Sequence, residues 1–148
     1  MLLPVRPNSS VGWIRARDVV LRATDYSLRV ELARHRLTLL RAGKVVRTIA
    51  TGAGASATPT PTGRFYVTDV VKLLDPGGPY GPFALGLSAY STVLDSFGPG
   101  DAQIAIHGTN DPSSIGVDRS HGCIHVANGE ISKLASVVGL GTPVTIVS

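Results

Sequence analysis

The sequence has 148 residues, of which 43% are hydrophobic, so it can bury one compact core and is not expected to be disordered. Its formal net charge of +4 is unevenly distributed, because residues 1–47 contain ten of the 14 Lys and Arg residues and three of the 10 Asp and Glu residues. No basic stripe interleaved with aromatic residues and no helix-turn-helix spacing accompanies this charge, so we predict no nucleic-acid partner. The basic third is expected to be a solvated face or one attracted to an anionic polymer.

Glycine and proline indicate the fold class. The 17 glycines and 10 prolines fall between short β-branched runs, which is typical of many turns and many short strands. A mainly β fold is therefore expected. No apolar run reaches the roughly 18 residues that a membrane-spanning helix requires, so no spanning segment is predicted.

Residues 1–26 are predicted to be an N-terminal strand or appendage, or the end of an upstream module. Residues 1–6 and 12–14 have strand patterns, and the Arg-Pro-Asn-Ser-Ser run at residues 6–10 indicates a turn between them. The first six residues lack the long apolar segment of a signal peptide, so an export signal is expected to lie outside this sequence. The main domain is predicted to cover residues 27–148.

Seven segments of the main domain have apolar or alternating patterns that predict strands. They are residues 28–33, 37–40, 45–50, 64–74, 83–87, 104–106 and 144–147. Ala42 and Gly43 predict a tight hairpin turn between the second and third of these segments.

The loop at residues 51–63 is rich in Gly, Ser, Thr and Pro, and it could be mistaken for a phosphate-binding loop. A Walker loop ends in Gly-Lys-Ser/Thr and continues into a helix, whereas Gly63 is followed by a predicted strand. We therefore predict that the loop is a structural connection whose prolines limit its flexibility.

One short helix is predicted near the C-terminus. Asn128 is expected to be its N-cap, Glu130 lies in its first turn, and Gly139 or Gly141 is expected to end it. Its buried stripe is predicted to comprise Ile131, Leu134, Ala135 and Val138.

The only cysteine lies in the run Ser120-His121-Gly122-Cys123, and three of the four histidines lie within residues 107–125 around it. A thiol attacks an acyl carbon as a thiolate, so a catalytic Cys123 needs a group that lowers its pKa. Gly122 permits a sharp bend, so the backbone N–H groups of His121, Gly122 and Cys123 could converge as an oxyanion hole. We therefore predict a cysteine nucleophile.

His107 is the predicted general base, because it stands at the end of a predicted strand that would hold its ring rigidly. A third group must fix the ring tautomer, and the carbonyl of Gly108 is the nearest candidate.

Two alternatives remain open for this cluster. Cys123 could be an inert, buried cysteine. Alternatively, His121, Cys123 and His125 could bind zinc with His107 as the fourth ligand, although zinc ligands usually come in pairs with a characteristic spacing.

The remaining candidates are assigned no catalytic role. His35 lies between two arginines and two predicted strands, and a turn that faces solvent explains it. Asp111 and Asp118 flank the loop before Ser120, and Asp111 belongs to ordinary Asn-Asp-Pro turn chemistry.

These residues resemble the YkuD-type L,D-transpeptidase catalytic domain. The likeness rests on Ile106-His107-Gly108-Thr109, on Ser120-His121-Gly122-Cys123-Ile124, which begins after twelve residues that follow His107, on Asn128 and on Gly141-Thr142-Pro143-Val144. The run Thr58 to Phe65 is similar to the Thr-Pro-x-Gly-x-Phe segment of the family, so the match covers about residues 27–148. Sortases and cell-wall endopeptidases, which are other cysteine enzymes, place the catalytic His and Cys differently.

The resemblance implies a mainly β fold, an L,D-transpeptidase-type β-sandwich with one short helix after the catalytic Cys. It implies that Cys123 attacks the peptidoglycan tetrapeptide stem between the diamino acid and the terminal D-alanine, which leaves as His107 transfers the proton. The amine of a second stem would then resolve the thioester to a 3→3 cross-link, whereas water would give L,D-carboxypeptidase activity. The enzyme would need no cofactor or metal.

The resemblance also implies substrate-binding roles for Ser120, His125, Thr109 and Tyr90. Peptidoglycan stem peptides would be the partners, β-lactams of the carbapenem type would be covalent inhibitors, and the location would be extracytoplasmic, at the cell wall or an equivalent of the periplasm. One position departs from the family, which usually has Arg or Asn two residues after the Cys, where this chain has His125. A neutral imidazole lacks the charged, bidentate fork of Arg, so a weakly active or inactive peptidoglycan-binding domain is the alternative.

Overall fold

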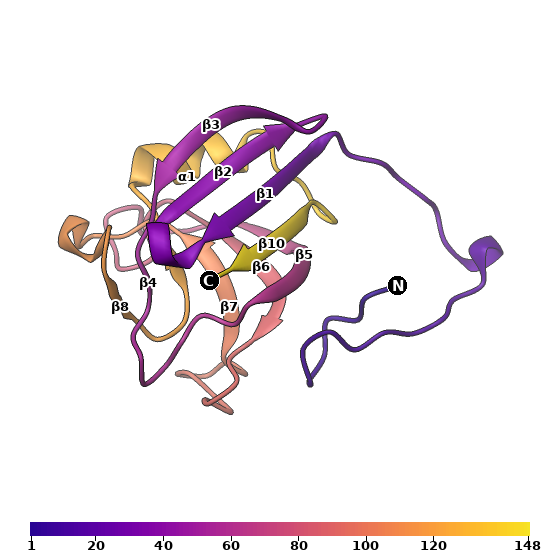
Figure 1. Ribbon diagram of the computed structural model, residues 1–148, viewed down its shortest axis with the longest axis horizontal. Coiled ribbons are helices and arrows are strands. Elements are labelled where there is room, and N and C mark those ends of the chain that lie inside the picture. The colour runs from indigo at the N-terminus through magenta and orange to yellow at the C-terminus, as the bar shows by residue number, and fades with distance from the viewer.

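The computed structural model describes residues 1–148, and it has a mainly β fold with one α-helix that follows Cys123, as predicted (Figure 1). Its elements, in chain order, are η1 (Ala16–Asp18), β1 (Tyr26–Glu31), η2 (Leu32–Arg34), β2 (Arg36–Arg41), β3 (Lys44–Ala50), β4 (Ala53–Gly54), β5 (Gly63–Lys72), β6 (Phe83–Tyr90), β7 (Gln103–His107), η3 (Pro112–Ser114), β8 (Asp118–Ser120), β9 (Ile124–His125), α1 (Asn128–Ala135) and β10 (Pro143–Val147).

Eight strands form one curled sheet in the order β3-β2-β1-β10-β5-β6-β7-β9, and β4 pairs with β8 in a small second sheet. The neighbouring pairs are antiparallel except β1 with β10 and β7 with β9 in the large sheet, and β4 with β8. The last strand, β10, therefore lies between β1 and β5, and it joins the first three strands to the rest of the sheet.

The core lies on one face of this sheet, because buried side chains alternate with more exposed ones along strands such as β1 and β10. In β1, Leu28 and Val30 are buried while Arg29 between them is exposed. Their partners in β10 are Val144 and Ile146, which are buried as well. Burying a side chain of this kind stabilises a fold by about 1.5–3 kcal/mol, and 19 buried residues form one continuous cluster.

The hairpin turn between β2 and β3 is where the sequence predicts it. Ala42 and Gly43 have φ angles of +49° and +77°, so both central residues are left-handed, as a type I′ turn requires. All seven predicted strands are present. The majority of their ends are shifted by one or two residues from the predicted positions. The strands that the sequence does not predict are β4, β8 and β9, each of two or three residues.

The helix differs from its prediction at both ends. Its N-cap is Ala127, and the side chain of Asn128 instead accepts a hydrogen bond of 2.8 Å from the backbone N–H of Thr109. The helix ends at Ala135, before either glycine, because the N–H groups of Val137 and Val138 both bind the carbonyl of Leu134 and close the last turn. Ile131, Leu134 and Val138 are buried and Ala135 is partly buried, as predicted, on β6 and β7.

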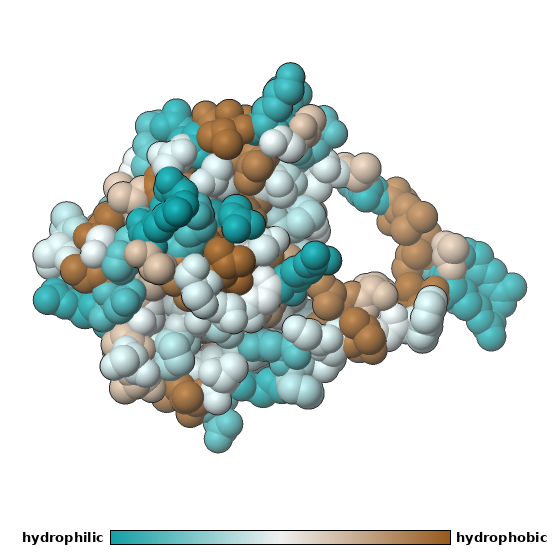
Figure 2. Space-filling model, in the orientation of Figure 1, coloured by the Kyte–Doolittle hydropathy of each residue, from teal (hydrophilic) through white to brown (hydrophobic).

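The N-terminal segment contains no strand, so the strand predictions for residues 1–6 and 12–14 are wrong. A single bridge joins Leu2 to Val11. The apolar residues that follow, Val11, Trp13, Ile14, Val20 and Leu21, are exposed, so they offer no buried face for a strand. Figure 2 shows this stretch as an arm outside the domain, with apolar residues on its surface. None of the helices has both the length and the apolar character that crossing a bilayer requires.

Candidate active site

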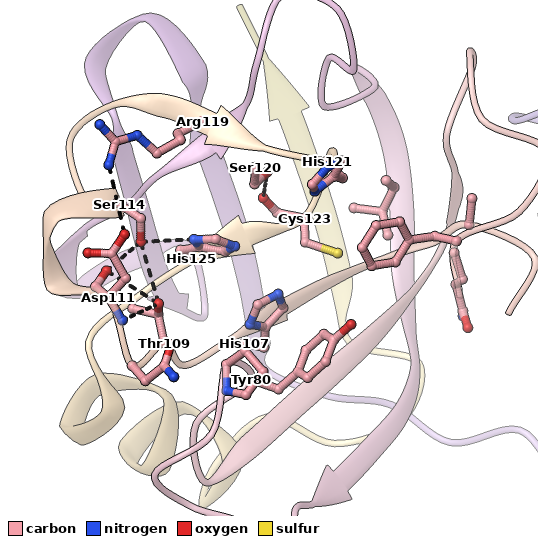
Figure 3. A pocket seen from close by; sticks show the side chains of 16 residues that line it. Tyr80, His107, Thr109, Asp111, Ser114, Arg119, Ser120, His121, Cys123 and His125 are labelled. Atoms are coloured by element: carbon pink, nitrogen blue, oxygen red, sulfur yellow. Dashed lines mark hydrogen bonds and ion pairs between the residues drawn. The ribbon is translucent and has the colours of Figure 1, made fainter. Parts of the chain in front are cut away.

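The site is built where β7 ends and β9 begins. These strands run parallel, with Ile106 opposite Ile124 and His107 opposite His125. Side chains at paired positions of neighbouring strands point to the same face of a sheet, so the two imidazole rings meet, with centroids 4.8 Å apart. The parallel pairing thus brings both ends of the motif to one place (Figure 3).

A pocket of about 270 Å³ opens over these strands. Of the residues singled out in the sequence, it is lined by His107, Thr109, Asp111, Ser120, His121, Cys123 and His125. It is also lined by Tyr80, Phe97, Ser114 and Arg119, to which sequence reasoning gave no role. Figure 3 shows the labelled side chains of this pocket drawn from several separate loops and strands, which is why sequence spacing alone does not find them.

The turn that carries Cys123 is closed by Ser120. Its hydroxyl donates to the carbonyl of Cys123 at 2.6 Å and accepts from the N–H of Gly122 at 3.1 Å. Gly122 has a φ of +116°, and a Cβ there would lie 2.9 Å from Cδ1 of Ile104, so no residue with a side chain fits without a shift. The turn therefore depends on both the serine and the glycine.

This turn changes the predicted oxyanion hole. The N–H of Gly122 is already engaged by Ser120, so the prediction is wrong for that amide. The N–H groups of His121 and Cys123 donate to no acceptor within the protein, so they remain free to bind an oxyanion.

The Thr-Pro loop, residues 51–63, holds the Cys123 turn through hydrogen bonds. Thr58 donates from Oγ1 to the carbonyl of Ser120 at 3.0 Å, and Thr60 donates from Oγ1 to the carbonyl of Gly122 at 2.8 Å. Thr60 also accepts from the N–H of Gly54 at 2.9 Å, and the N–H of Ala55 binds the carbonyl of Ser120. The loop is thus the structural connection that its composition predicts, and it holds the cysteine turn.

His107 is buried, with 3% of its surface exposed. Its Nδ1 lies 2.6 Å from the carbonyl oxygen of Gly108, and because a carbonyl can only accept, Nδ1 carries the proton and Nε2 keeps its lone pair. The pKa of His107 is lowered to about 4, mainly by burial; the bond to Gly108 acts to raise this pKa and the neighbouring His125 acts to lower it. The ring of Tyr80 packs against His107 with centroids 4.8 Å apart. The His107 ring is therefore neutral near pH 7.

Cys123 is a free, partly exposed thiol. Burial raises its pKa, although a hydrogen bond with the backbone of Ala105 acts in the opposite direction. No hydrogen bond joins its sulfur to His107. The thiol pKa is therefore raised and not lowered, contrary to the expectation from the sequence, because burial of the sulfur disfavours the charged thiolate. The resting pair is a neutral thiol and a neutral imidazole.

His125 belongs to a polar network on the other wall of the pocket. The hydroxyl of Ser114 donates to the carbonyl of Asp111 at 2.7 Å, so it accepts from Nδ1 of His125 at 2.9 Å. Burial lowers the pKa of His125, while the charge of Asp111 raises it. His125 is thus a neutral ring whose Nε2 is not used by this network.

The hydroxyl groups of two predicted substrate-binding residues already have hydrogen-bond partners within the protein. Ser120 and Thr109 are both buried, and the hydroxyl of Thr109 accepts from the N–H of Asp111 at 3.0 Å. They shape the pocket wall and offer no free hydroxyl. Tyr90 does not line the pocket, and its hydroxyl donates to the carbonyl of Pro4 at 2.8 Å.

Arg119 is the one Lys or Arg side chain in the pocket lining. Its side chain is 65% exposed, and its Nη1 lies 3.8 Å from Oδ2 of Asp111 and 3.4 Å from Oγ of Ser113. These are long contacts for an exposed pair, so the guanidinium is held loosely. The one feature of the sequence that points to Arg119 as a pocket residue is its position directly before Ser120.

The remaining predictions concern aspartates, zinc and His35. Asp111 caps η3, as expected of turn chemistry, by accepting from the N–H of Ser113 at 3.0 Å. No group of three or more His, Cys, Asp or Glu side chains is placed to hold a metal ion, so the geometry does not support the zinc alternative. His35 lies in a left-handed turn, but its Nε2 contacts Oδ1 of Asp118 at 3.0 Å, so solvent alone does not explain it.

Comparison with known proteins identifies the family. A family model described as the YkuD L,D-transpeptidase catalytic domain matches residues 25–146. The L,D-transpeptidase YkuD of Bacillus subtilis (strain 168) is 34% identical over 151 residues, which cover 98% of this chain and 84% of that protein.

Two solved structures share the fold. The L,D-transpeptidase LdtMt1 in complex with imipenem has a TM-score of 0.63 and 22% identity over 83% of this chain. L,D-transpeptidase 3 from Mycobacterium tuberculosis in complex with a faropenem-derived adduct has a TM-score of 0.65 and 16% identity over 84% of this chain. The match spans 59% and 60% of those two longer chains. From the family match, the identity to YkuD and the shared fold together, this chain belongs to the YkuD family of L,D-transpeptidase catalytic domains.

Proposed function

We propose that this protein is a peptidoglycan L,D-transpeptidase that works through a covalent thioester on Cys123. The observation that supports the proposal most directly is the convergence of three features in one pocket. They are the thiol of Cys123, the two free N–H groups of His121 and Cys123, and a neutral His107 whose Nε2 is not engaged. Each supplies one requirement of acyl transfer: nucleophile, oxyanion stabilisation and base.

In the first half-reaction, Nε2 of His107 accepts the thiol proton as Sγ of Cys123 attacks the carbonyl carbon between the diamino acid and D-alanine. The carbonyl oxygen becomes negative and accepts hydrogen bonds from the N–H groups of His121 and Cys123. The C–N bond then breaks, His107 returns the proton to the departing amine, and D-alanine leaves. A neutral thiol and a neutral base suit this concerted transfer, because neither group must be charged before the substrate binds.

In the second half-reaction, the side-chain amine of another stem attacks the thioester carbonyl. His107 accepts the amine proton and returns it to the leaving sulfur, which restores the thiol and completes a 3→3 cross-link. Water in place of the amine gives a carboxypeptidase product. This chemistry belongs at the cell wall, so we place the protein outside the cytoplasm.

Imipenem and a stem tetrapeptide test the proposal. Purified protein is incubated with each and measured by intact mass and product mass, with Cys123→Ala as the inactive variant and His35→Ala as a histidine control outside the pocket. We expect one imipenem adduct and a cross-linked dimer for the wild type and for His35→Ala, and neither for Cys123→Ala. No adduct on the wild type, or an equal adduct on Cys123→Ala, would end the proposal.

One observation favours a second function, a peptidoglycan-binding domain with little activity. His125 is neutral and its Nδ1 is committed to Ser114, so it provides no fixed charge for a substrate carboxylate. Stem-peptide binding without turnover, unchanged by Cys123→Ala, would favour this function over catalysis.

A further inference from the structure

The loop at residues 91–102, between β6 and β7, forms part of the active-site wall. Its Phe97 lines the pocket, and the ring lies with its centroid 4.9 Å from that of His121, next to the nucleophile. The loop has few hydrogen bonds of its own: Ser91 binds Ala102, Phe97 and Gly100 bind each other, and the hydroxyl of Ser91 accepts from the N–H groups of Val93 and Leu94. Its position therefore depends on support from outside the loop.

Arg6 provides that support at three points. Its guanidinium donates to the carbonyls of Ser91 at 2.5 Å, Leu94 at 2.9 Å and Asp101 at 2.7 Å, which are at the start, within and near the end of the loop. Only a planar guanidinium can present several N–H groups in fixed directions to separate carbonyls, and a lysine ammonium cannot. The guanidinium carbon also lies 5.2 Å from the centre of the Tyr90 ring, within cation–π range.

Asn8 fixes the same segment to the end of β6. Its Nδ2 donates to the carbonyl of Tyr90 at 2.7 Å, and its Oδ1 accepts from the N–H of Tyr90 at 2.9 Å. This reciprocal pair imitates a residue of a neighbouring strand. The hydroxyl of Tyr90 adds a bond to the carbonyl of Pro4. Residues 4–8 are therefore attached to the catalytic domain although they lie before the region that the family model matches.

We propose that Arg6 and Asn8, the N-terminal clamp, are positioning residues that hold the 91–102 loop and Phe97 over the active site and so determine how well the acyl donor binds. The inference rests on the proposed function. It concerns binding more than chemistry, because other contacts hold the reacting groups: Thr60 holds the Cys123 turn, and the Gly108 carbonyl holds His107.

Kinetics with a stem-tetrapeptide donor test the clamp in the full chain. We expect Arg6→Gln to raise KM about 5- to 10-fold while kcat stays within about twofold, since the loss falls on binding of the donor. Arg6→Lys should behave like Arg6→Gln. The matched control is Arg15→Gln, which changes an exposed arginine of the same segment whose side chain makes no hydrogen bond, and it should behave like the wild type.

Hydrogen exchange and a double mutant separate positioning from general stability. In Arg6→Gln, amides of residues 91–102 should exchange faster, while those of residues 120–125 keep their wild-type rates. Phe97→Ala should raise KM as well, and Arg6→Gln should add little to it, because both changes act through the same ring.

Each outcome decides one proposal. Full additivity of Arg6→Gln and Phe97→Ala, or a fall in kcat with an unchanged KM, would overturn the clamp while leaving the transpeptidase proposal intact. An inactive wild-type protein would overturn the proposed function and the clamp's role in donor binding together.

Discussion

Thr60 donates a hydrogen bond of 2.8 Å from its Oγ1 to the carbonyl oxygen of Gly122, the residue before Cys123. The same hydroxyl accepts from the N–H of Gly54, and Thr60 is buried, with 5% of its surface exposed. A residue about sixty positions upstream thus holds the cysteine turn, which gives the Thr-Pro loop a direct part in the site.

Replacing Thr60 by Val keeps the shape and removes the hydroxyl. The buried carbonyl of Gly122 and the partly buried N–H of Gly54 then lose their partner, so we expect the free energy of unfolding to fall by about 1–3 kcal/mol. The imipenem acylation rate should fall as well, because the turn that orients Cys123 loosens. Urea unfolding and adduct mass measure the two effects. Thr60→Ser, which keeps the hydroxyl, serves as the control, and equal behaviour of the Val and Ser variants would contradict the prediction.

The neutral state of Cys123 predicts slow alkylation near neutral pH. Because burial raises the thiol pKa, the rate with iodoacetamide should rise steadily from about pH 7 to pH 9 as the thiolate forms. Ultraviolet absorbance of the thiolate, taken as the difference between wild type and Cys123→Ser, should be absent at about pH 7. A thiolate signal already complete at neutral pH would show that an ion pair with His107 is the resting state.

The pKa of His107 predicts how stability depends on pH. Folding lowers this pKa from 6.5 to about 4, so between those values the unfolded chain binds a proton that the folded chain does not. Stability from this residue is therefore complete above pH 6.5 and is lost as the pH falls toward 4, by about 3 kcal/mol in all. The lowered pKa of His125 acts in the same direction.

Urea unfolding at several pH values measures this dependence. The wild type should lose more stability than His107→Gln on acidification through the same range, because glutamine does not titrate. Parallel curves for the two proteins would exclude His107 as the source of the loss.

Because Arg119 lines the pocket, we expect the protein to prefer an acyl donor that carries a free carboxylate near the scissile bond. Arg119→Gln should lower kcat/KM for such a donor about 5- to 10-fold, with little change in stability, because the side chain is exposed. Converting the donor carboxylate to a carboxamide should cost the wild type more than it costs the variant. Arg64→Gln, on the exposed face of β5, is the control. An equal cost in both proteins would assign Arg119 no role in reading that charge.

The sequence predicts the parts of this protein that depend on local patterns. Alternation predicts β1 and β10 because Leu28 and Val30 in β1, and Val144 and Ile146 in β10, all lie on the buried face of the sheet. Ala42-Gly43 predicts a turn that requires residues with left-handed backbone conformations. The parts that it does not predict depend on distant pairing. The strands β8 and β9 are too short to show a period, so neither the meeting of His107 with His125 nor the place of Arg119 follows from spacing.

Side-chain partners explain the remaining differences. Asn128 has a strong preference for an N-cap, yet its amide binds the Thr109 backbone, a contact that exists only after the loop has folded onto the helix. The thiol pKa was predicted from neighbouring residue types, but it is set by how far Cys123 is removed from water, which no sequence pattern reports.

The place of β10 between β1 and β5 also constrains how the protein is made. A ribosome delivers β1 to β3 more than ninety residues before Pro143–Val147, and until then neither β1 nor β5 has its second neighbour. The growing chain therefore carries open sheet edges until β10 is made, and such edges are sites where unfinished chains can pair with one another. The two halves of the sheet can join only once β10 has been made, and a chaperone that shields those edges would act before that strand arrives.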